Sequence, residues 1–259
     1  MNQLLRIAGL ALALLAMPAA QAGSFLDNYI GSNSAADVIG SSTYNISGAS
    51  ITRVGSVLTV TINTAFAGHA GMDTFANPKG IGYGDVFLSQ LWNPAGSAST
   101  GYLTDNANNG TDWQYGFNLA DRWSTATTGK FTLYKLDGAN STNILNSNSF
   151  ITCGANCTYR QDQETAVNTA AGSTAVMQTV GGAALQGDWT VTADQSIKFS
   201  INVASVSDLM NFKSFAMHWG ETCQNDVIEG ATSVPEPAGL ALLGLGLCGM
   251  LALRRRKAA

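Results

Sequence analysis

The sequence predicts an all-β domain, a β-sandwich or jelly-roll-like fold, with an apolar segment at each end of the chain. Short segments in which apolar side chains alternate with Thr, Ser or Asn recur along the sequence, and a period of two is typical of half-buried strands. Asn, Asp and Gly separate these segments and favour tight turns. Only 12% of the residues are charged. Many short strands with turn residues between them indicate a sandwich or a jelly roll.

The clearest strand is predicted over residues 56–65, where Val, Leu and Ile alternate with Thr. Residues 85–92 are rich in large apolar side chains and have the length of a buried strand, and residues 112–120 follow Asn109-Gly110, a pair typical of hairpins. Further strands, each bounded by turn residues, are predicted over residues 130–136, 189–193, 197–203 and 215–219. Residues 206–212 have a helical pattern with a serine available as N-cap.

These elements place the β-sandwich between residues 51 and 230. Residues 23–50 are rich in small side chains with little alternation, and we expect a soft segment there. Residues 231–237 are expected to form a linker, because they contain two prolines next to small polar residues.

Residues 1–22 have the features of a secretory signal peptide. A cation, Arg6, precedes an apolar core over residues 7–17, and Ala20-Gln21-Ala22 fits the cleavage rule of signal peptidase. The apolar core is too short to span a bilayer. Cleavage is expected before Gly23.

The carboxyl-terminal end has three consecutive parts. They are Val234-Pro235-Glu236-Pro237, an uncharged run over residues 238–253, and the cations Arg254, Arg255, Arg256 and Lys257. As a helix at ~1.5 Å per residue the run would be ~24 Å long, and it could span a ~30 Å hydrocarbon core if the bilayer thins and basic side chains reach the interface. The cations would remain cytoplasmic. Residues 238–259 are therefore predicted to form a transmembrane helix and a basic tail.

This three-part tail resembles the PEP-CTERM sorting signal of exopolysaccharide-producing Gram-negative bacteria, over residues 234–257. The resemblance implies that exosortase, an integral membrane cysteine transpeptidase, cuts near the Pro-Glu-Pro. It also implies an inner-membrane-anchored precursor and a mature form at the cell surface or in the extracellular matrix. Residues 82–88, 159–164 and 215–230 resemble segments of ectodomains that carry such tails, which look like β-sandwich surface proteins without an assigned activity.

The charge of the exported part argues against nucleic acid as a partner. Residues 23–234 contain eight Lys or Arg and sixteen Asp or Glu, a net charge of −8, and no two of these cations are adjacent. Phosphate binding needs clustered cations.

Cys153 and Cys157 enclose a Gly- and Asn-containing loop and could form a disulfide after export, with Cα atoms within roughly 7 Å of each other. Pairing of Cys223 with one of them is the alternative. Cys248 lies in the apolar tail and would leave with it. A zinc site built on these cysteines is not expected, because neither His69 nor His218 stands near a cysteine at ligand spacing.

Residues 105–112 are rich in Asp and Asn, and an irregular calcium site could use Asp105, Asn109 or Asp112. The EF-hand pattern is not fulfilled, since Ala107 and Gly116 stand where ligands are needed. An Asn-Gly turn with polar neighbours is the favoured alternative. No other cofactor is expected.

We interpret the chain as a non-enzymatic exported surface or matrix protein associated with exopolysaccharide. One alternative is a lectin-like module that binds sugar through exposed aromatic rings, although such rings more often fill a core. The candidate rings are Trp92, Trp113, Tyr115, Trp123 and Trp189. A second alternative is a secreted hydrolase using Asp162 and Glu164, but the neighbouring Gln161 and Gln163 suggest a solvated face.

Overall fold

The computed structural model describes residues 20–28, 30–31 and 37–233, and it is mostly β. The predicted signal-peptide core and the predicted transmembrane run lie outside these residues. Within the part that is described, no helix is long and apolar enough to cross a membrane.

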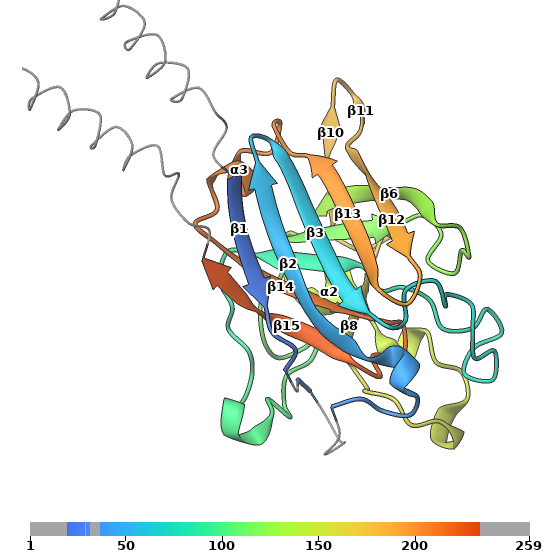
Figure 1. The fold of residues 1–259 in the computed structure, drawn as a ribbon. Helices are drawn as coiled ribbons and strands as arrows, with labels where there is room; N and C mark the ends of the chain where they lie inside the picture. The colour runs from blue at the N-terminus through green and yellow to red at the C-terminus, as the bar shows by residue number, and fades with distance from the viewer. Residues whose placement is uncertain (1–19, 29, 32–36, 234–259) are drawn as a thin grey trace, which may run out of the picture.

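One antiparallel sheet forms the body of the domain (Figure 1). Its strands are joined in the order β1-β2-β3-β13-β12-β6-β5-β4-β14-β15, and β9 pairs with β6 in addition. Their bounds are β1 (Ala20–Phe25), β2 (Ile46–Val54), β3 (Val57–Thr64), β4 (Val86–Ser89), β5 (Tyr115–Leu119), β6 (Thr128–Lys135), β9 (Val176–Met177), β12 (Gln186–Thr192), β13 (Ser196–Asn202), β14 (Ser214–Gly220) and β15 (Val227–Ser233).

Two short ladders and two short α-helices accompany the main sheet within the described residues. A two-stranded ladder joins β7 (Ile144–Asn146) to β8 (Glu164–Val167), and another joins β10 (Thr179–Val180) to β11 (Ala183–Ala184). The helices are short, with α2 at Asn140–Asn143 and α3 at Ser207–Asn211. The predicted helix over residues 206–212 is confirmed as α3.

The sheet curls until its two outer strands lie next to each other. A Cβ added at Gly23 in β1 would lie 2.2 Å from the side-chain oxygen of Thr232 in β15. The predicted sandwich of separate sheets therefore differs from the structure, in which the two layers in Figure 1 are halves of one continuous sheet. The curl covers the outer strands against each other and limits exposed edge.

Aromatic side chains fill the space between the layers. The rings of Phe117 and Phe131 stack with centroids 4.5 Å apart, and Phe199 packs edge-on against Phe131. Two large side chains on neighbouring strands lie opposite glycines: Phe131 is paired with Gly187 and Trp189 with Gly129. A Cβ at either glycine would lie 2.3 Å from the facing ring, so only glycine fits there.

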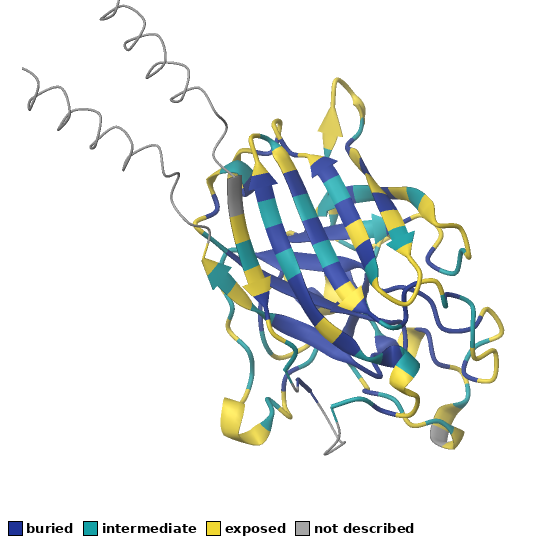
Figure 2. Cartoon of the chain, viewed as in Figure 1, coloured by how far each residue is buried: buried dark blue, intermediate teal, exposed yellow. Residues whose placement is uncertain are grey.

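The front strands β3 and β13 show the alternation of buried and exposed residues that the sequence indicated, and the neighbouring β2 shows a similar pattern (Figure 2). Strands β4 and β14 are instead buried on both faces. Their outer face is covered by residues 90–114 and by the β7–β8 ladder, which form a second apolar cluster around Phe87, Trp113 and Val167. The candidate site lies on this covered face.

Described strands extend across three of the predicted boundaries. The expected soft segment over residues 23–50 contributes β1 and the start of β2, with buried Phe25 and Ile46. The expected linker over residues 231–237 begins inside β15, which ends at Ser233. The expected cleavage point before Gly23 falls within β1, and cleavage there would leave residues 23–25 paired with β2.

Candidate functional site

All three glutamates between residues 23 and 233 are buried. Glu164, Glu221 and Glu229 are each at most 1% exposed. Glutamate is seldom fully buried without a partner, because removing a carboxylate from water is costly. These residues mark two buried polar clusters, one around His218 and one around Asp226.

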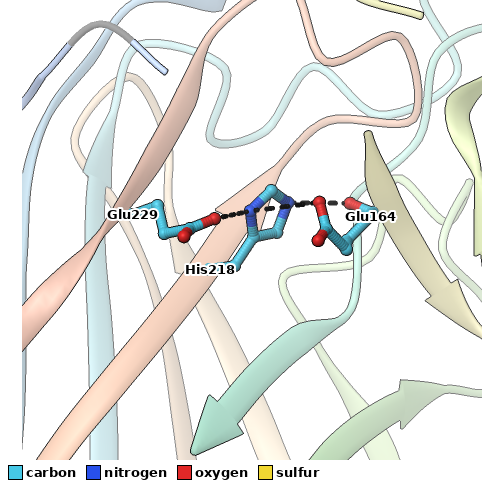
Figure 3. Close-up of side chains that lie close together, drawn as sticks. All are labelled: Glu164, His218 and Glu229. Atoms are coloured by element: carbon cyan, nitrogen blue, oxygen red, sulfur yellow. Dashed lines mark hydrogen bonds and ion pairs between the residues drawn. The ribbon is translucent and has the colours of Figure 1, made fainter. Parts of the chain in front are cut away.

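The first cluster consists of Glu164 from β8, His218 from β14 and Glu229 from β15 (Figure 3). His218 and Glu229 are directly opposite each other in the β14–β15 ladder. His218 Nδ1 lies 2.9 Å from Glu229 Oε2 and 3.9 Å from Glu164 Oε2. His218 Nε2 lies 2.8 Å from the main-chain oxygen of Glu164. Because a carbonyl oxygen only accepts, Nε2 carries a hydrogen and Nδ1 faces the two carboxylates.

Indole groups hold the other oxygen of each glutamate. Trp113 Nε1 donates to Glu164 Oε1 at 3.1 Å, and Trp92 Nε1 donates to Glu229 Oε1 at 2.7 Å. The ring of His218 packs against Trp113 and Phe87, with centroids 5.9 and 6.1 Å away. These rings shield the cluster and fix the orientation of its polar atoms.

Burial and mutual charge shift the pKa values of His218, Glu164 and the neighbouring Asp105. Burial alone lowers the pKa of His218, but the Glu164 carboxylate and the hydrogen bond to Glu229 outweigh it and raise this pKa to about 9. Burial raises the pKa of Glu164 to about 6, although His218 acts in the opposite direction. Burial, with the nearby charges of Glu229 and Glu164, raises the pKa of Asp105 to about 8. At neutral pH we expect a proton on His218 and on Asp105.

Of the three residues predicted as calcium ligands, Asp105 is the one that lies near this cluster. Its carboxylate is buried and accepts a hydrogen bond from Ala95 N at 2.5 Å. Asn109 and Asp112 are exposed, and Asn109 forms a bridge with Asn106 in a tight turn. The predicted residues therefore occupy two different environments, and a calcium site formed by them remains a prediction.

The second cluster surrounds Asp226. Its carboxylate accepts hydrogen bonds from Ile46 N at 2.7 Å and Val227 N at 2.8 Å, and it gathers with Asp27 and Asp37 so that one oxygen of each lies within 4.8 Å of the others. Burial raises the pKa of Asp226 to about 8 despite these hydrogen bonds, and the charges of Asp27 and Asp37 add to the effect. Burial also raises the pKa of Glu221 well above its ordinary value, with a contribution from Asp226.

The three ectodomain segments that the sequence singled out meet at these clusters. Gly84 N donates to Gly220 O at 3.0 Å, which joins residues 82–88 to residues 215–230. Arg160 Nη1 donates to Asn225 O at 2.8 Å, and Gln224 Nε2 donates to Glu164 O at 2.7 Å. The segments thus form one buried polar layer, although the sequence alone did not predict their contact.

The solvated face expected around residues 161–164 is present only in part, since Gln161 is exposed and Asp162 is partly exposed. Gln163 and Glu164 are fully buried, because residues of other loops cover β8 on both sides. Gln163 Nε2 donates to Asp105 O at 2.6 Å. The carboxylate of Asp162 accepts instead from the side chains of Asn146 and Asn148.

The candidate aromatic rings are divided between core and surface. Trp113, Tyr115 and Trp189 are buried, whereas Trp92 and Trp123 are partly exposed.

The predicted disulfide between Cys153 and Cys157 is present, with Cα atoms 5.8 Å apart. Cys223 is a free and buried thiol.

Comparison with known families concerns the tail. Residues 233–257 match the model of the PEP-CTERM protein-sorting motif. The chain carries a PEP-CTERM sorting signal. It is therefore an exported protein of the kind that exosortase sorts, as the sequence predicted. No curated protein and no solved structure matches the chain.

The PEP-CTERM signal follows the domain without a spacer. Ser233, the first residue of the match, is the last residue of β15. The predicted processing residues Val234, Pro235, Glu236 and Pro237, and the cations Arg254 to Lys257, lie outside the described residues. The end of β15 lies next to the start of the domain, since Thr232 approaches Gly23.

Proposed function

We propose that this protein is a non-enzymatic surface or matrix protein that exosortase releases from the inner membrane into an extracellular polysaccharide layer. The observation that carries the proposal is the PEP-CTERM motif, which begins where β15 ends. Signal peptidase acts at the other end, before Gly23. In this account the tail directs sorting and cleavage, and the β domain is the part that is exported.

The physical reason for cleavage lies in the tail's charge pattern. Residues 238–253 are apolar and enter the bilayer, whereas the four following cations resist translocation. Moving a single cation to the centre of the bilayer costs ~2.5–3.5 kcal/mol on insertion scales. Export therefore stops at this point, and release requires a cut between the domain and the apolar run.

The fold supports such a cut. The ladder between β14 and β15 is complete at Ser233, so removal of everything after this residue breaks no strand pairing of the described sheet. Because Gly23 lies beside Thr232, both proposed cuts fall at one corner of the domain. The Pro-Glu-Pro sequence disfavours a helical conformation of the residue before each proline, which suits a segment that a protease must cut.

Replacement of Pro235-Glu236-Pro237 by three alanines is expected to leave an uncleaved, membrane-retained precursor. Fractionation followed by immunoblotting measures the retained and released forms. Deletion of residues 238–259 is the matched control, and it should give a soluble secreted domain without sorting. Maturation and release of the triple-alanine variant at the normal rate would contradict the proposal and reduce the tail to an anchor.

The lectin-like module and the secreted hydrolase remain alternative hypotheses for the ectodomain. A glycan array with the released protein distinguishes the lectin from a matrix protein without sugar affinity.

A further inference from the structure

The buried cluster of Glu164, His218 and Glu229 has the arrangement of a metal-ion site. We propose that it binds one divalent first-row transition-metal ion, through His218 Nδ1 and one oxygen of each glutamate. Asp105 is the neighbouring carboxylate that could complete the ligand set. The proposal is independent of the sorting function of the tail.

The spacing of the ligand atoms suits such an ion. Ligands at ~2.1 Å around a tetrahedral ion are separated from each other by about 3.4 Å. The distances from His218 Nδ1 to Glu229 Oε2 and Glu164 Oε2, 2.9 and 3.9 Å, lie on either side of this value. All three ligand atoms lie within 4.8 Å of one another. Small side-chain movements would therefore complete the coordination.

The surrounding hydrogen bonds orient the ligands in the way typical of metal sites. The Nε2–H of His218 donates to the main-chain oxygen of Glu164, so Nδ1 is the nitrogen that binds an ion once the ion has displaced its proton. The indoles of Trp113 and Trp92 hold Oε1 of Glu164 and of Glu229, and each glutamate keeps Oε2 for the same central position. Both ligating carboxylates and the imidazole are thus fixed from outside the site.

Two buried oxygens without a hydrogen bond independently point to a ligand at this position. Glu164 Oε2 is the oxygen of this side chain that faces Nδ1 of His218. It accepts no hydrogen bond within the described residues. Asp105 Oδ2 also accepts none there, and its carboxylate lies close to both glutamates. Both side chains are 1% exposed. The two glutamates carry more negative charge than a single imidazolium neutralises, and a divalent ion would balance it.

The mixed donor set defines the class of ion. Imidazole nitrogen suits Zn²⁺, Fe²⁺ and similar ions, whereas carboxylate oxygen extends the range to Mn²⁺. Alkaline-earth ions favour sites made of oxygen alone.

Trp92 donates a hydrogen bond to Glu229 and also lines an open hollow with Gln90 and Asp112, so this ring separates the site from the surface. Because the three ligands are buried, loading is expected as the domain folds.

The test uses the exported protein, refolded from denaturant after chelation with and without Zn²⁺ or Mn²⁺. We expect about one ion per chain by elemental analysis, and a rise in Tm of roughly 5–10 °C at a free-ion concentration near 100 times the Kd. Glu164→Gln should lose the bound ion and the rise in Tm. Glu221→Gln, a change at a buried glutamate outside the cluster, should retain both.

Pulsed electron paramagnetic resonance of the Mn²⁺-loaded protein gives a readout that does not depend on whether the Glu164 variant folds. A nitrogen coupling from one imidazole is expected in the wild type and in His69→Gln, which changes the other, partly exposed histidine. Absence of this coupling, absence of a bound ion, or equal metal retention by a folded Glu164→Gln variant would each overturn the proposal.

Discussion

Replacing Asp85 by alanine is expected to lower the free energy of unfolding by about 3–5 kcal/mol, the range for removal of one partner from a buried ion pair. Asp85 is 1% exposed and lies 3.1 Å from the guanidinium of Arg122. It also accepts hydrogen bonds from Leu119 N at 3.0 Å and Val167 N at 2.8 Å. Its loss would leave a buried cation and two buried N–H groups without their acceptor.

Urea unfolding or a thermal melt measures this effect, and a loss of this size corresponds to a fall in Tm of roughly 6–20 °C. The matched control is Asp188→Ala, which removes the exposed ion pair with Lys130. Exposed pairs contribute about 0–1 kcal/mol, so the control should be nearly as stable as the wild type. Equal stability of the Asp85 and Asp188 variants would show that the Asp85 network does not hold the layers together.

Stability is expected to fall as the pH rises from 5 to 8. Burial raises the pKa of Asp226 to about 8 in the folded protein, against 3.8 for the unfolded chain. Below pH 3.8 the carboxyl is protonated in both states and its contribution is fully present. Between the two values unfolding releases a proton, so each pH unit removes about 1.4 kcal/mol, and the contribution is lost once the pH passes the folded pKa.

The neighbours of Asp226 act in the same direction. Burial raises the pKa of Asp27 to about 6 and that of Glu221 well above its ordinary value, while Arg160 opposes both shifts. Urea unfolding at a series of pH values should show a shallower slope for Asp226→Asn than for the wild type. Asp121→Asn, a change at an exposed residue, should retain the wild-type slope. Stability that is constant or increases from pH 5 to 8 would contradict this interpretation.

Most strands of the sheet were predicted from the sequence. Alternation or flanking turn residues mark β3, β6, β12 and β13, and the predicted segments 85–92, 112–120 and 215–219 contain β4, β5 and most of β14. β2 was missed because its start combines Ser, Gly and Ala, whose small side chains give little apolar signal, and its pairing with β3 supplies the order. β15 was missed because Glu229 and Gly230 interrupt its apolar run, and burial of Glu229 depends on partners from other strands.

The candidate site could not be assembled from sequence spacing. Glu164 is 54 residues from His218, and the two meet through the position of β8 over the outer face of β14. Residues 161–164 were interpreted as solvated because Gln and Glu usually face water, whereas the surrounding loops bury Gln163 and Glu164. The Cys153–Cys157 bridge was predictable because its geometry is local. The tail was predictable because its signal is linear.

The central claim, export with a cut at each end of the domain, is tested most directly by the intact mass of the released protein after alkylation in denaturant without reduction. The account predicts a chain that begins at Gly23 and ends near Pro235-Glu236-Pro237. It also predicts one disulfide and one alkylated thiol, Cys223, with Cys248 removed in the tail. A released chain whose mass extends to Ala259 would contradict the account.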